Sequence, residues 1–186
     1  LKPSNLTFEQ AAAFQTAYLT AYVSLVRRGN LMKGETLLVH GSTGGVGMAA
    51  VQLGKYLGAK VIATGTSEEK LKHTKSWGAD HTILTHKNGK VEFREEVKDL
   101  TEGKGADVIY DPVGGDVFDQ SIRCINWGGR LLVVGFASGR IPSLPVNMAL
   151  INGFSVIGVR AGEFGRKDPL AGKENNVAIR EICEAG

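Results

Sequence analysis

Cysteine and long hydrophobic runs are scarce in this 186-residue chain. Its two cysteines, Cys124 and Cys183, lie far apart with no Cys-x-x-Cys or Cys/His spacing beside them, which supports neither a disulfide framework nor a zinc site. The longest apolar run, residues 131–136, is far below the roughly 20 residues of a membrane-spanning helix, and no charged start leads into an apolar signal core. We therefore expect a cytoplasmic protein of a reducing compartment, with no membrane partner and no metal.

The chain also lacks a concentration of charge of one sign. With 22 basic and 19 acidic residues its net charge is +3, and the basic residues are scattered along the sequence. Nucleic-acid binding is therefore not indicated. The chain starts at Leu1 instead of Met and stops directly after an amphipathic segment, so we expect it to be part of a longer protein.

Glycine, by contrast, is abundant, and it punctuates a regular alternation of apolar runs and helical patterns. There are 25 glycines, about twice the usual share. Short β-branched runs predict six strands, at residues 36–40, 61–64, 81–85, 107–111, 130–135 and 154–159. Helical patterns fall between them at 46–57, 68–77, 92–100, 116–125 and 147–151. Several strands are apolar on both faces, as parallel strands covered by helices are, so the alternation predicts an α/β fold with a doubly wound parallel sheet.

Two flanking segments depart from this alternation. Residues 7–10 form a Thr-x-x-Gln capping box that opens an alanine-rich helix, and a second helical stretch runs over 16–28 until Gly29 ends it. Residues 161–175 are glycine-rich and polar, which predicts a loop. Residues 177–184 then resume a helical pattern with no strand after it.

The most informative stretch is a glycine-rich turn between the first strand and the helix after it. Strand 36–40 runs into Gly41-Ser42-Thr43-Gly44-Gly45-Val46-Gly47, and a helix and a second strand follow in the order that a dinucleotide site requires. Glycine lets the backbone turn tightly and approach a pyrophosphate, and the helix opening at Val46 aims unpaired amides and its positive dipole end at the phosphates. Gly47 is expected to allow close packing of helix on sheet. The alternative is a tight turn chosen only for packing.

The tip of the second strand favours NADP over NAD. Rossmann sites that prefer NAD place a carboxylate about twenty positions after the glycine turn, where it binds the ribose 2′-hydroxyl. Here residues 64–67 are Thr-Gly-Thr-Ser, without a carboxylate, and Lys70 follows in the first turn of the next helix. Thr66, Ser67 and Lys70 are therefore candidates for binding the adenosine 2′-phosphate. The alternative is that Lys70 is a solvated lysine and Ser67 only a helix N-cap.

At these residues the sequence resembles the medium-chain dehydrogenase/reductase superfamily, and within it the zinc-independent NADPH:quinone oxidoreductases related to zeta-crystallin. The resemblance rests on AAAFQTAYLTAYVSL, on GETLLVHGSTGGVGMAAVQLGKYLGAKVIATGTSEEKLKHTKSWGADHTI, on ADVIYDPVGG and on GGRLLVVGFASG, in the family's order and spacing. It implies a Rossmann fold whose six parallel strands lie in the order 3-2-1-4-5-6. It further implies a helical lead at 1–29 from a GroES-like catalytic domain missing here, a Rossmann dinucleotide-binding domain at 30–160, and a truncated loop and helix at 161–186.

The resemblance also implies where an NADPH cofactor lies. It places five residues around the pyrophosphate, Gly44, Gly45, Val46, Gly47 and Met48, and three around the 2′-phosphate, Thr66, Ser67 and Lys70. Toward the nicotinamide end it places Asp111, Gly135, Phe136 and Ala137. Ligands of open α/β sheets bind beyond the carboxyl ends of the strands, where these residues fall. Thr20 resembles a family threonine near the nicotinamide, although a role in helix packing is equally open.

One position departs from the family pattern. Many relatives have a tyrosine just after the third strand, beside the 2′-phosphate, where this chain has Thr85 followed by His86. Thr85 remains a candidate cofactor contact beside His86. The departure leaves the strictness of the preference for NADPH open.

Catalytic groups are expected to lie outside this chain, because in this superfamily the GroES-like barrel supplies the substrate pocket and, in zinc-dependent members, the metal ligands. The four histidines, His40, His73, His81 and His86, are not grouped with cysteines or carboxylates at ligand spacing. His40 is interpreted as a strand-end residue satisfied by hydrogen bonds. The chain alone is therefore expected to be inactive.

The resemblance implies hydride transfer from NADPH to a small-molecule quinone or activated alkene, with the cofactor carrying the chemistry. Two alternatives stay open. One is a domain of a zinc-containing alcohol dehydrogenase or enoyl reductase, and the other is a dinucleotide-binding module without turnover.

The last predicted strand, 154–159, is apolar and lies at the edge of the predicted sheet. An uncovered edge of this kind tends to pair with another chain, and relatives are often dimers through this strand. We therefore expect a homodimer in which the two copies of this strand pair antiparallel across a two-fold axis.

Overall fold

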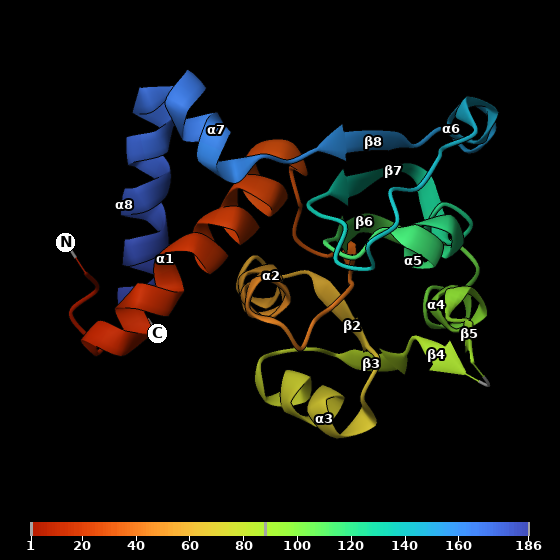
Figure 1. Cartoon of the computed structure of the whole chain (residues 1–186), viewed down its shortest axis with the longest axis horizontal. Coiled ribbons are helices and arrows are strands. Elements are labelled where there is room, and N and C mark those ends of the chain that lie inside the picture. The colour runs from red at the N-terminus through yellow and green to blue at the C-terminus, as the bar shows by residue number, and fades with distance from the viewer. Residues whose placement is uncertain (1, 88, 186) are drawn as a thin grey trace.

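Six parallel strands form a sheet at the centre of the structure, a computed structural model that describes residues 2–87 and 89–185 (Figure 1). In spatial order the strands are β3 (His81–Leu84), β2 (Lys60–Gly65), β1 (Thr36–Val39), β6 (Ala106–Asp111), β7 (Ile125–Val133) and β8 (Ser155–Gly158). Each neighbouring pair is parallel. Counted within the sheet, this is the predicted order 3-2-1-4-5-6, so the doubly wound α/β fold is confirmed.

The predicted helical lead is one continuous rod instead of two helices. α1 (Phe8–Tyr22) passes directly into a π-helix, η1 (Val23–Arg28). The predicted capping box is confirmed, because the Thr7 hydroxyl accepts the backbone N–H of Gln10 and the Gln10 side chain accepts that of Thr7. The amino end of α1 is therefore fixed by its own sequence.

The π-helix ends at a glycine that the packing requires. The Gly29 N–H donates to the Ser24 carbonyl at 2.7 Å, and a Cβ on Gly29 would lie only 2.8 Å from that same oxygen. It would also lie 3.0 Å from Cδ1 of Leu132 in the sheet. Glycine thus ends the helix as predicted, although its φ of −82° is right-handed, so the reason is lack of space and not left-handed geometry.

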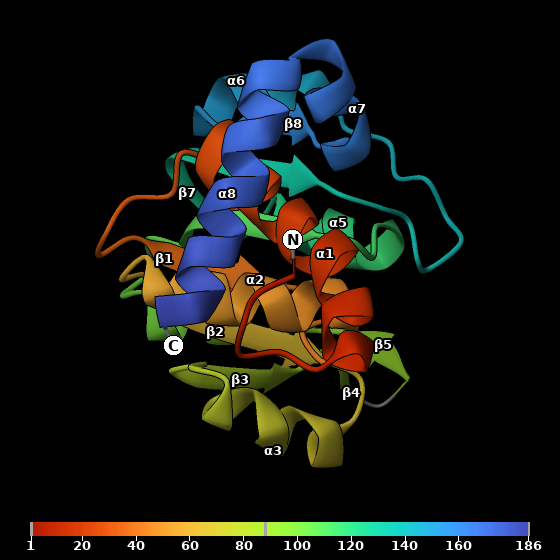
Figure 2. The same ribbon diagram turned by 90° about the vertical axis from the view of Figure 1, so that its left-hand side faces the viewer.

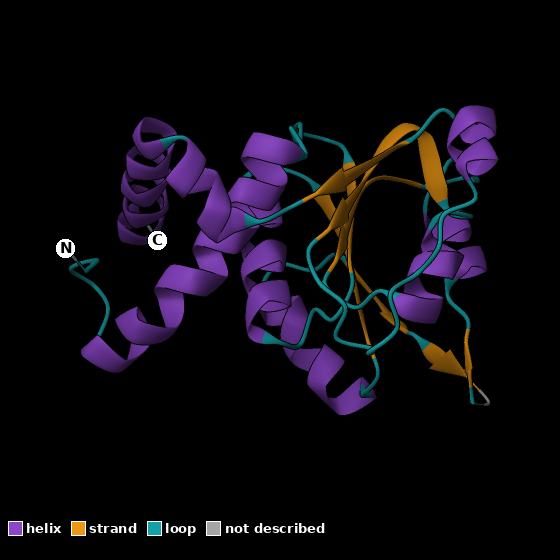
Figure 3. Ribbon diagram, turned by 45° about the horizontal axis from the view of Figure 1, so that its top comes forward, coloured by secondary structure: helices purple, strands orange, loops and turns teal. Residues whose placement is uncertain are grey.

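Helices cover both faces of the sheet, as Figure 3 shows. Along the chain between β1 and β8, the helices are α2 (Gly45–Tyr56), α3 (Glu68–Ser76), α4 (Arg94–Leu100), α5 (Gly115–Ser121) and α6 (Val146–Asn152). One core cluster joins residues of α1 and α2 to one face of the sheet, and a second joins residues of α4 and α5 to the other. β1 shows the division: Leu37 and Val39 belong to the first cluster and Leu38 to the second, and all three are fully buried.

The segment predicted as a loop at 161–175 is helical, which corrects the sequence-based expectation. It contains the whole of one helix, α7 (Ala161–Lys167), and the first part of a second, α8 (Pro169–Ala185). Asp168 between them accepts the Ala171 N–H at 3.0 Å and so begins α8. The glycines serve close packing, because a Cβ on Gly172 would lie 2.9 Å from the Cα of Gly165 in α7. A composition typical of loops therefore reflects tight contact between two helices.

α8 lies against α1 and brings residues from both ends of the described chain together (Figure 2). The Ser4 N–H donates to the Glu184 carboxylate at 2.9 Å, and the Asn5 side-chain amide donates to the Cys183 carbonyl at 2.7 Å. The helical pattern predicted at 177–184 is thus confirmed as part of a longer helix, α8, that packs on α1.

A short antiparallel hairpin lies outside the main sheet and was not expected from the sequence. Its strands are β4 (His86–Lys87) and β5 (Lys90–Val91).

The bounds of β7 and α5 also differ from the prediction. β7 begins at Ile125, five residues before the predicted start at 130, and α5 ends earlier than predicted, at Ser121. Ala106 pairs with Ile125 across an irregularity in the ladder between β6 and β7, so tertiary pairing extends the strand into a stretch with a helical pattern.

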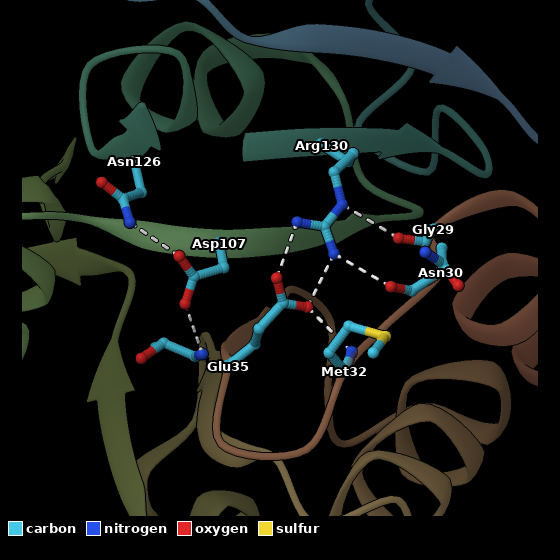
Figure 4. A network of polar contacts seen from close by, with 8 residues as sticks. Gly29, Asn30, Met32, Glu35, Asp107, Asn126 and Arg130 are labelled. Atoms are coloured by element: carbon cyan, nitrogen blue, oxygen red, sulfur yellow. Dashed lines mark hydrogen bonds and ion pairs between the residues drawn. The ribbon is translucent and has the colours of Figure 1, made fainter. Parts of the chain in front are cut away.

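A polar network fixes the amino-terminal edge of the sheet (Figure 4). The Arg130 guanidinium donates to both oxygens of Glu35, at 2.9 and 2.6 Å, and the Met32 N–H donates to the same carboxylate at 2.8 Å. Burial raises the pKa of Glu35, but the bonds from Arg130 and from the Met32 N–H outweigh it and hold the pKa below its usual value. Beside it, Asp107 accepts the Thr36 N–H at 2.7 Å. These bonds tie β6 and β7 to the start of β1, and so help to set the register of the strands whose opposite ends carry the candidate site.

No helix within the described part of the chain is long and apolar enough to cross a membrane.

Candidate functional site

The predicted site residues lie mostly in the loops and first helical turns that follow the carboxyl ends of neighbouring parallel strands, β2, β1, β6 and β7. Backbone hydrogen bonds join these loops. The Ser42 N–H donates to the Thr64 carbonyl at 3.0 Å, and the Val134 N–H donates to the Asp111 carbonyl at 2.9 Å. The fold thus brings residues that are far apart in the sequence to one edge of the sheet, which is where open α/β sheets bind ligands.

The glycine turn links β1 to α2 through a left-handed residue. Gly41 has a φ of +57°, and the Gly44 N–H closes the turn on the Gly41 carbonyl at 3.0 Å. A Cβ on Gly47 would lie 2.2 Å from the Gly41 oxygen, so the first turn of α2 packs directly on the backbone of the turn. The close packing predicted for Gly47 is confirmed.

The amino end of α2 is open. Gly44 and Gly45 are exposed, and Val46 and Met48 are half-buried. A Cβ on Gly45 would meet nothing within 4 Å, and one on Gly44 would meet only the Gly41 oxygen, at 3.5 Å. The N-cap is Gly44, so no side chain caps the helix. The first N–H groups and the positive end of the helix dipole are therefore available to an anion.

The tip of β2 lies beside this helix end. A Cβ on Gly65 would lie 3.5 Å from Cγ2 of Thr43 in the glycine turn. Beyond Gly65, Thr66 and Lys70 are exposed, and Ser67 caps α3 by accepting the Lys70 N–H at 3.4 Å. The N-cap role considered for Ser67 is therefore real. It leaves the side chains of Thr66 and Lys70 exposed beyond the tip of β2.

Asp111 ends β6 and organises the loop after it. Its carboxylate accepts the N–H groups of Val113 and Gly114, both at 2.8 Å. Burial raises the pKa of Asp111, and the bonds from Gly114 and Val113 oppose that rise. The side chain is only 1% exposed, so its contact with any ligand is limited to the little surface that it presents.

The loop after β7 packs on the loop after β6. The Gly135 N–H approaches the Asp111 carbonyl at 3.3 Å, and the Ala137 N–H donates to the Pro112 carbonyl at 3.1 Å. A Cβ on Gly114 would lie 3.0 Å from Cδ1 of Phe136. Phe136 is 41% exposed despite its size. The structure therefore brings all four residues predicted near the nicotinamide end, Asp111 and Gly135 to Ala137, close together, with Asp111 buried and Phe136 and Ala137 exposed.

Two predicted contacts have partners within the protein. The Thr20 hydroxyl donates to the Thr16 carbonyl of its own helix at 2.8 Å. Thr85 is buried, and its hydroxyl donates to the Gly65 carbonyl at 3.0 Å, with Nδ1 of His86 at 3.1 Å. Thr85 therefore joins the ends of β2 and β3 beneath the candidate 2′-phosphate residues.

Sequence reasoning missed two serines that hold the glycine turn in place. The buried Ser42 hydroxyl donates to the Thr64 carbonyl at 2.9 Å. The Ser121 hydroxyl lies 2.8 Å from Nε2 of His40, whose Nδ1 lies 2.8 Å from the Thr64 hydroxyl. His40 is thus satisfied by hydrogen bonds at the end of β1, as predicted. A serine beside a strand-end glycine is a detectable turn signal, but the role of Ser121 depends on how α5 packs.

Burial lowers the pKa of His40 to about 3, which predicts a loss of stability in mild acid. Below the unfolded value of about 6.5, the unfolded chain binds a proton that the folded chain refuses until near pH 3. The free energy of unfolding should therefore fall by up to about 1.4 kcal/mol per pH unit on this account. Urea unfolding of wild type and of His40→Gln between these pH values measures this fall in the free energy of unfolding.

The slope of the free energy of unfolding against pH should be shallower in His40→Gln than in wild type. His73→Asn, at an exposed position on α3, should leave this slope unchanged. Parallel slopes in all three proteins would show that His40 is not the titrating group.

The fold, the open helix end and the adjoining loops are those of a Rossmann-like domain of the nucleotide-binding type. The family model described as "Zinc-binding dehydrogenase" matches residues 45–171. The chain belongs to this family, and through it to the medium-chain dehydrogenase/reductase superfamily. Within the described residues, no group of three or more His, Cys, Asp or Glu side chains is placed to hold a metal ion.

Relatives and solved structures agree with this assignment. The chain is 43% identical over 175 residues to "Quinone oxidoreductase-like protein 2 homolog" of Nematostella vectensis, covering 93% of the chain and 47% of that protein. It matches a mycobacterial structure solved with NADPH at 32% identity and a TM-score of 0.81, over 88% of this chain and 50% of that one. It matches the CurK enoyl reductase at 26% identity and a TM-score of 0.87, over 100% and 54%. The chain spans about half the length of the curated relatives it matches.

Proposed function

We propose that this chain is the NADPH-binding part of a reductase that passes hydride to a quinone or an activated alkene. The observation that carries the proposal is the open amino end of α2 at Gly44 and Gly45, together with an exposed Lys70 in the first turn of the helix that follows β2. An uncapped helix end in a glycine turn suits a pyrophosphate, and the absence of a carboxylate at the tip of β2 suits a 2′-phosphate. The match to a structure solved with NADPH supports the same cofactor.

The residues present fit the parts of the cofactor. The exposed backbone of Gly44 and Gly45, with Val46 and Met48 beside it, would hold the pyrophosphate, and Thr66, Ser67 and Lys70 would hold the 2′-phosphate. The loop residues Gly135, Phe136 and Ala137 would lie toward the nicotinamide, with the buried Asp111 holding the adjoining loop, and Thr20 would lie at the same end. NADPH supplies the hydride when it is bound. The chain's own contribution is to hold the dinucleotide extended and to present one face of its ring.

Fluorescence titration of this chain with NADPH and with NADH tests the proposal. We expect both nucleotides to bind, and NADPH to bind more tightly. Absence of binding would overturn the proposed site as a whole. Equal affinity for the two nucleotides would overturn the assignment of the 2′-phosphate residues alone.

Gly44→Val is expected to weaken NADH and NADPH alike, by at least about tenfold. The backbone of Gly44 has a φ of −90° and a ψ of 167°, which valine adopts readily, and the nearest atom to an added Cβ is 3.5 Å away. The side chain would instead fill the space where the phosphates approach the backbone. Titration with both nucleotides, together with a urea unfolding curve, measures the result.

The unfolding midpoint of Gly44→Val should stay close to that of wild type. A loss of binding restricted to NADPH would contradict the assignment of this turn to the pyrophosphate, which both cofactors share.

The hydride acceptor distinguishes the alternatives for the whole protein. Relatives named for quinone oxidoreductase support a quinone, and the match to an enoyl reductase supports an activated alkene. Oxidation of NADPH should be followed with a quinone, with an α,β-unsaturated ketone and with an enoyl thioester, in a protein long enough to match the whole of these relatives. Turnover with one acceptor identifies the substrate class. Binding of NADPH without turnover on any acceptor would favour a non-catalytic dinucleotide-binding module.

We further propose that the chain forms a homodimer through β8, the last strand of the sheet. Val156 on this edge strand is 38% exposed, and large apolar side chains are also exposed on the nearby β7 and α6, namely Trp127 at 74%, Val146 at 80%, Leu150 at 81% and Ile151 at 64%. An unpaired strand edge and an apolar surface together suit an antiparallel contact with a second copy. Val156→Lys would place two charges in that contact.

Val156→Lys is therefore expected to convert the dimer to a monomer in light scattering at high protein concentration. The matched control is Leu170→Lys on α8, where the side chain is also exposed, at 69%. This control should remain a dimer. A wild-type monomer, or a dimer that survives Val156→Lys, would contradict the proposal.

A further inference from the structure

A chain of buried polar side chains runs beneath the carboxyl ends of β1 and β2, on the face of the sheet that α4 and α5 cover. Its members Thr64, His40 and Ser121 are each fully buried. Nδ1 of His40 lies 2.8 Å from the Thr64 hydroxyl, and Nε2 lies 2.8 Å from the Ser121 hydroxyl. The ring of Phe93, directly before α4, packs against the imidazole with the ring centroids 4.9 Å apart. Both nitrogens of the His40 ring therefore have partners within the protein, out of contact with solvent.

The number of hydrogens in this chain gives it a direction. The Ser121 hydroxyl donates to the Val117 carbonyl, one turn earlier in α5, at 2.7 Å. A hydroxyl carries a single hydrogen, so the Ser121 oxygen is left to accept from Nε2 of His40. Because burial lowers the pKa of His40 to about 3, the ring is neutral at pH 7 and carries only one N–H. Nδ1 is then an acceptor, and the Thr64 hydroxyl donates to it.

The chain joins three parts of the candidate site. His40 directly precedes the glycine turn, Thr64 is the penultimate residue of β2, and Ser121 is the last residue of α5, the helix after the β6 loop. The Thr64 carbonyl also accepts both the N–H and the hydroxyl of Ser42 in the glycine turn, at 3.0 and 2.9 Å. The end of β2 is thus held twice, by the glycine turn through the Thr64 carbonyl and by His40 through the Thr64 hydroxyl.

We propose that His40 is a positioning residue for the dinucleotide, which fixes the tip of β2 relative to the glycine turn by bridging Thr64 and Ser121 as the Nε2–H tautomer. The inference rests on the proposed function, because Thr66 and Lys70, which follow the tip of β2, are the proposed contacts of the 2′-phosphate. A fully satisfied buried network favours one arrangement of its members, and removal of one partner leaves a costly unpaired group in the interior. A cut at the far end of the chain should therefore alter the tip of β2.

The tautomer of His40 is measured by nitrogen-15 NMR of the imidazole, in the protein without nucleotide. At pH 7 we expect a neutral ring with its proton on Nε2, and we expect this proton to exchange with solvent much more slowly than that of His73, which is exposed on α3. In Ser121→Ala the Nε2–H loses its acceptor, so its exchange should become faster. A proton on Nδ1, or a charged ring, in the wild type would overturn the proposal.

Fluorescence titration with NADPH and NADH measures the positioning role. Ser121→Ala should lower the ratio of NADPH to NADH affinity by about two- to tenfold, the effect of one hydrogen bond, because only NADPH uses the 2′-phosphate residues. Thr64→Val, which removes the hydroxyl and keeps the branched shape, should lower the ratio similarly. The double variant should lose no more than the more affected single variant, because both substitutions cut one chain. The control is Thr74→Val, where an equally buried hydroxyl donates to the Leu71 carbonyl of its own helix at 2.7 Å, and its ratio should match that of wild type.

The outcomes separate this inference from the proposed function. A wild type that prefers NADPH, with an unchanged preference in Ser121→Ala and Thr64→Val, would overturn the positioning role alone. So would additive losses in the double variant or an equal loss in Thr74→Val, because either would indicate general loosening of the fold. A wild type that binds neither nucleotide would overturn the proposed function and the positioning role with it. If a variant does not fold in a urea unfolding curve, the tautomer of wild type and the remaining single variant decide.

Discussion

Lys70→Ala is expected to erase most of the preference for NADPH over NADH, by about 10- to 100-fold. The Lys70 side chain is exposed at the amino end of α3, the helix that follows the tip of β2. A charge-assisted contact to the 2′-phosphate is worth roughly 1.5–3 kcal/mol. NADH lacks that phosphate, so its affinity should hardly change. Fluorescence titrations with both nucleotides give the ratio directly.

The matched control is Lys72→Ala, because Lys72 is exposed on the same helix. It removes an equal charge and should leave the ratio of affinities unchanged. Equal losses in the two variants would assign the effect to overall charge instead of a contact. Because Glu68 and Glu69 share the first turn of α3 with Lys70, the titration should be repeated at higher salt, where the contribution of distant charges is screened.

Gly47→Ala is expected to destabilise the fold by about 3 kcal/mol, as overpacking against rigid backbone does. The added Cβ would lie 2.2 Å from the Gly41 oxygen and 2.7 Å from the Gly41 carbon and the Ser42 Cα. All three atoms belong to the backbone of the turn, so no side chain can move aside. α2 would have to shift away from β1. The midpoint of urea unfolding measures the loss.

Gly45→Ala is the control for this variant. The two residues lie two positions apart in the first turn of α2, yet an added Cβ on Gly45 meets nothing within 4 Å. Its stability should therefore stay near that of wild type, or rise slightly because alanine favours helix. Equal destabilisation by both substitutions would mean that helix propensity, and not contact with Gly41, governs this turn.

The local sequence was sufficient for those parts of the fold whose signals are short in range. The capping box at Thr7 and Gln10 is closed by residues three positions apart, and the alternation of strands and helices needs only hydrophobic periodicity. The glycine turn was also predictable from the local sequence, because a strand pattern directly precedes it and a helical pattern directly follows it. Parallel strands with helical crossovers leave few topologies, so the sheet order followed once the alternation was recognised.

The sequence-based prediction was wrong where glycine, which is typical of loops, instead allows two helices to pack closely. Glycine at 165 and 172 is typical of a loop, but in the structure it lets α7 and α8 approach until a Cβ would lie 2.9 Å from the facing Cα. Gly44 and Gly47 illustrate the same ambiguity within one motif, since the first is open and the second is fully packed. Whether a glycine is open or closely packed depends on which residues of other elements lie next to it in the folded structure.

By itself, then, the sequence determined the doubly wound sheet, the place of the glycine turn and the absence of a carboxylate at the tip of β2, because each depends on residues close together in the chain. The tertiary structure alone decided which turn amides stay open, how His40 is held between Thr64 and Ser121, and how the buried Asn175 accepts a hydrogen bond from Arg27. Those properties depend on contacts between residues far apart in the chain, such as Arg27 with Asn175 and His40 with Ser121. Local pattern carries no record of such pairs, because packing forms them only after the elements have assembled.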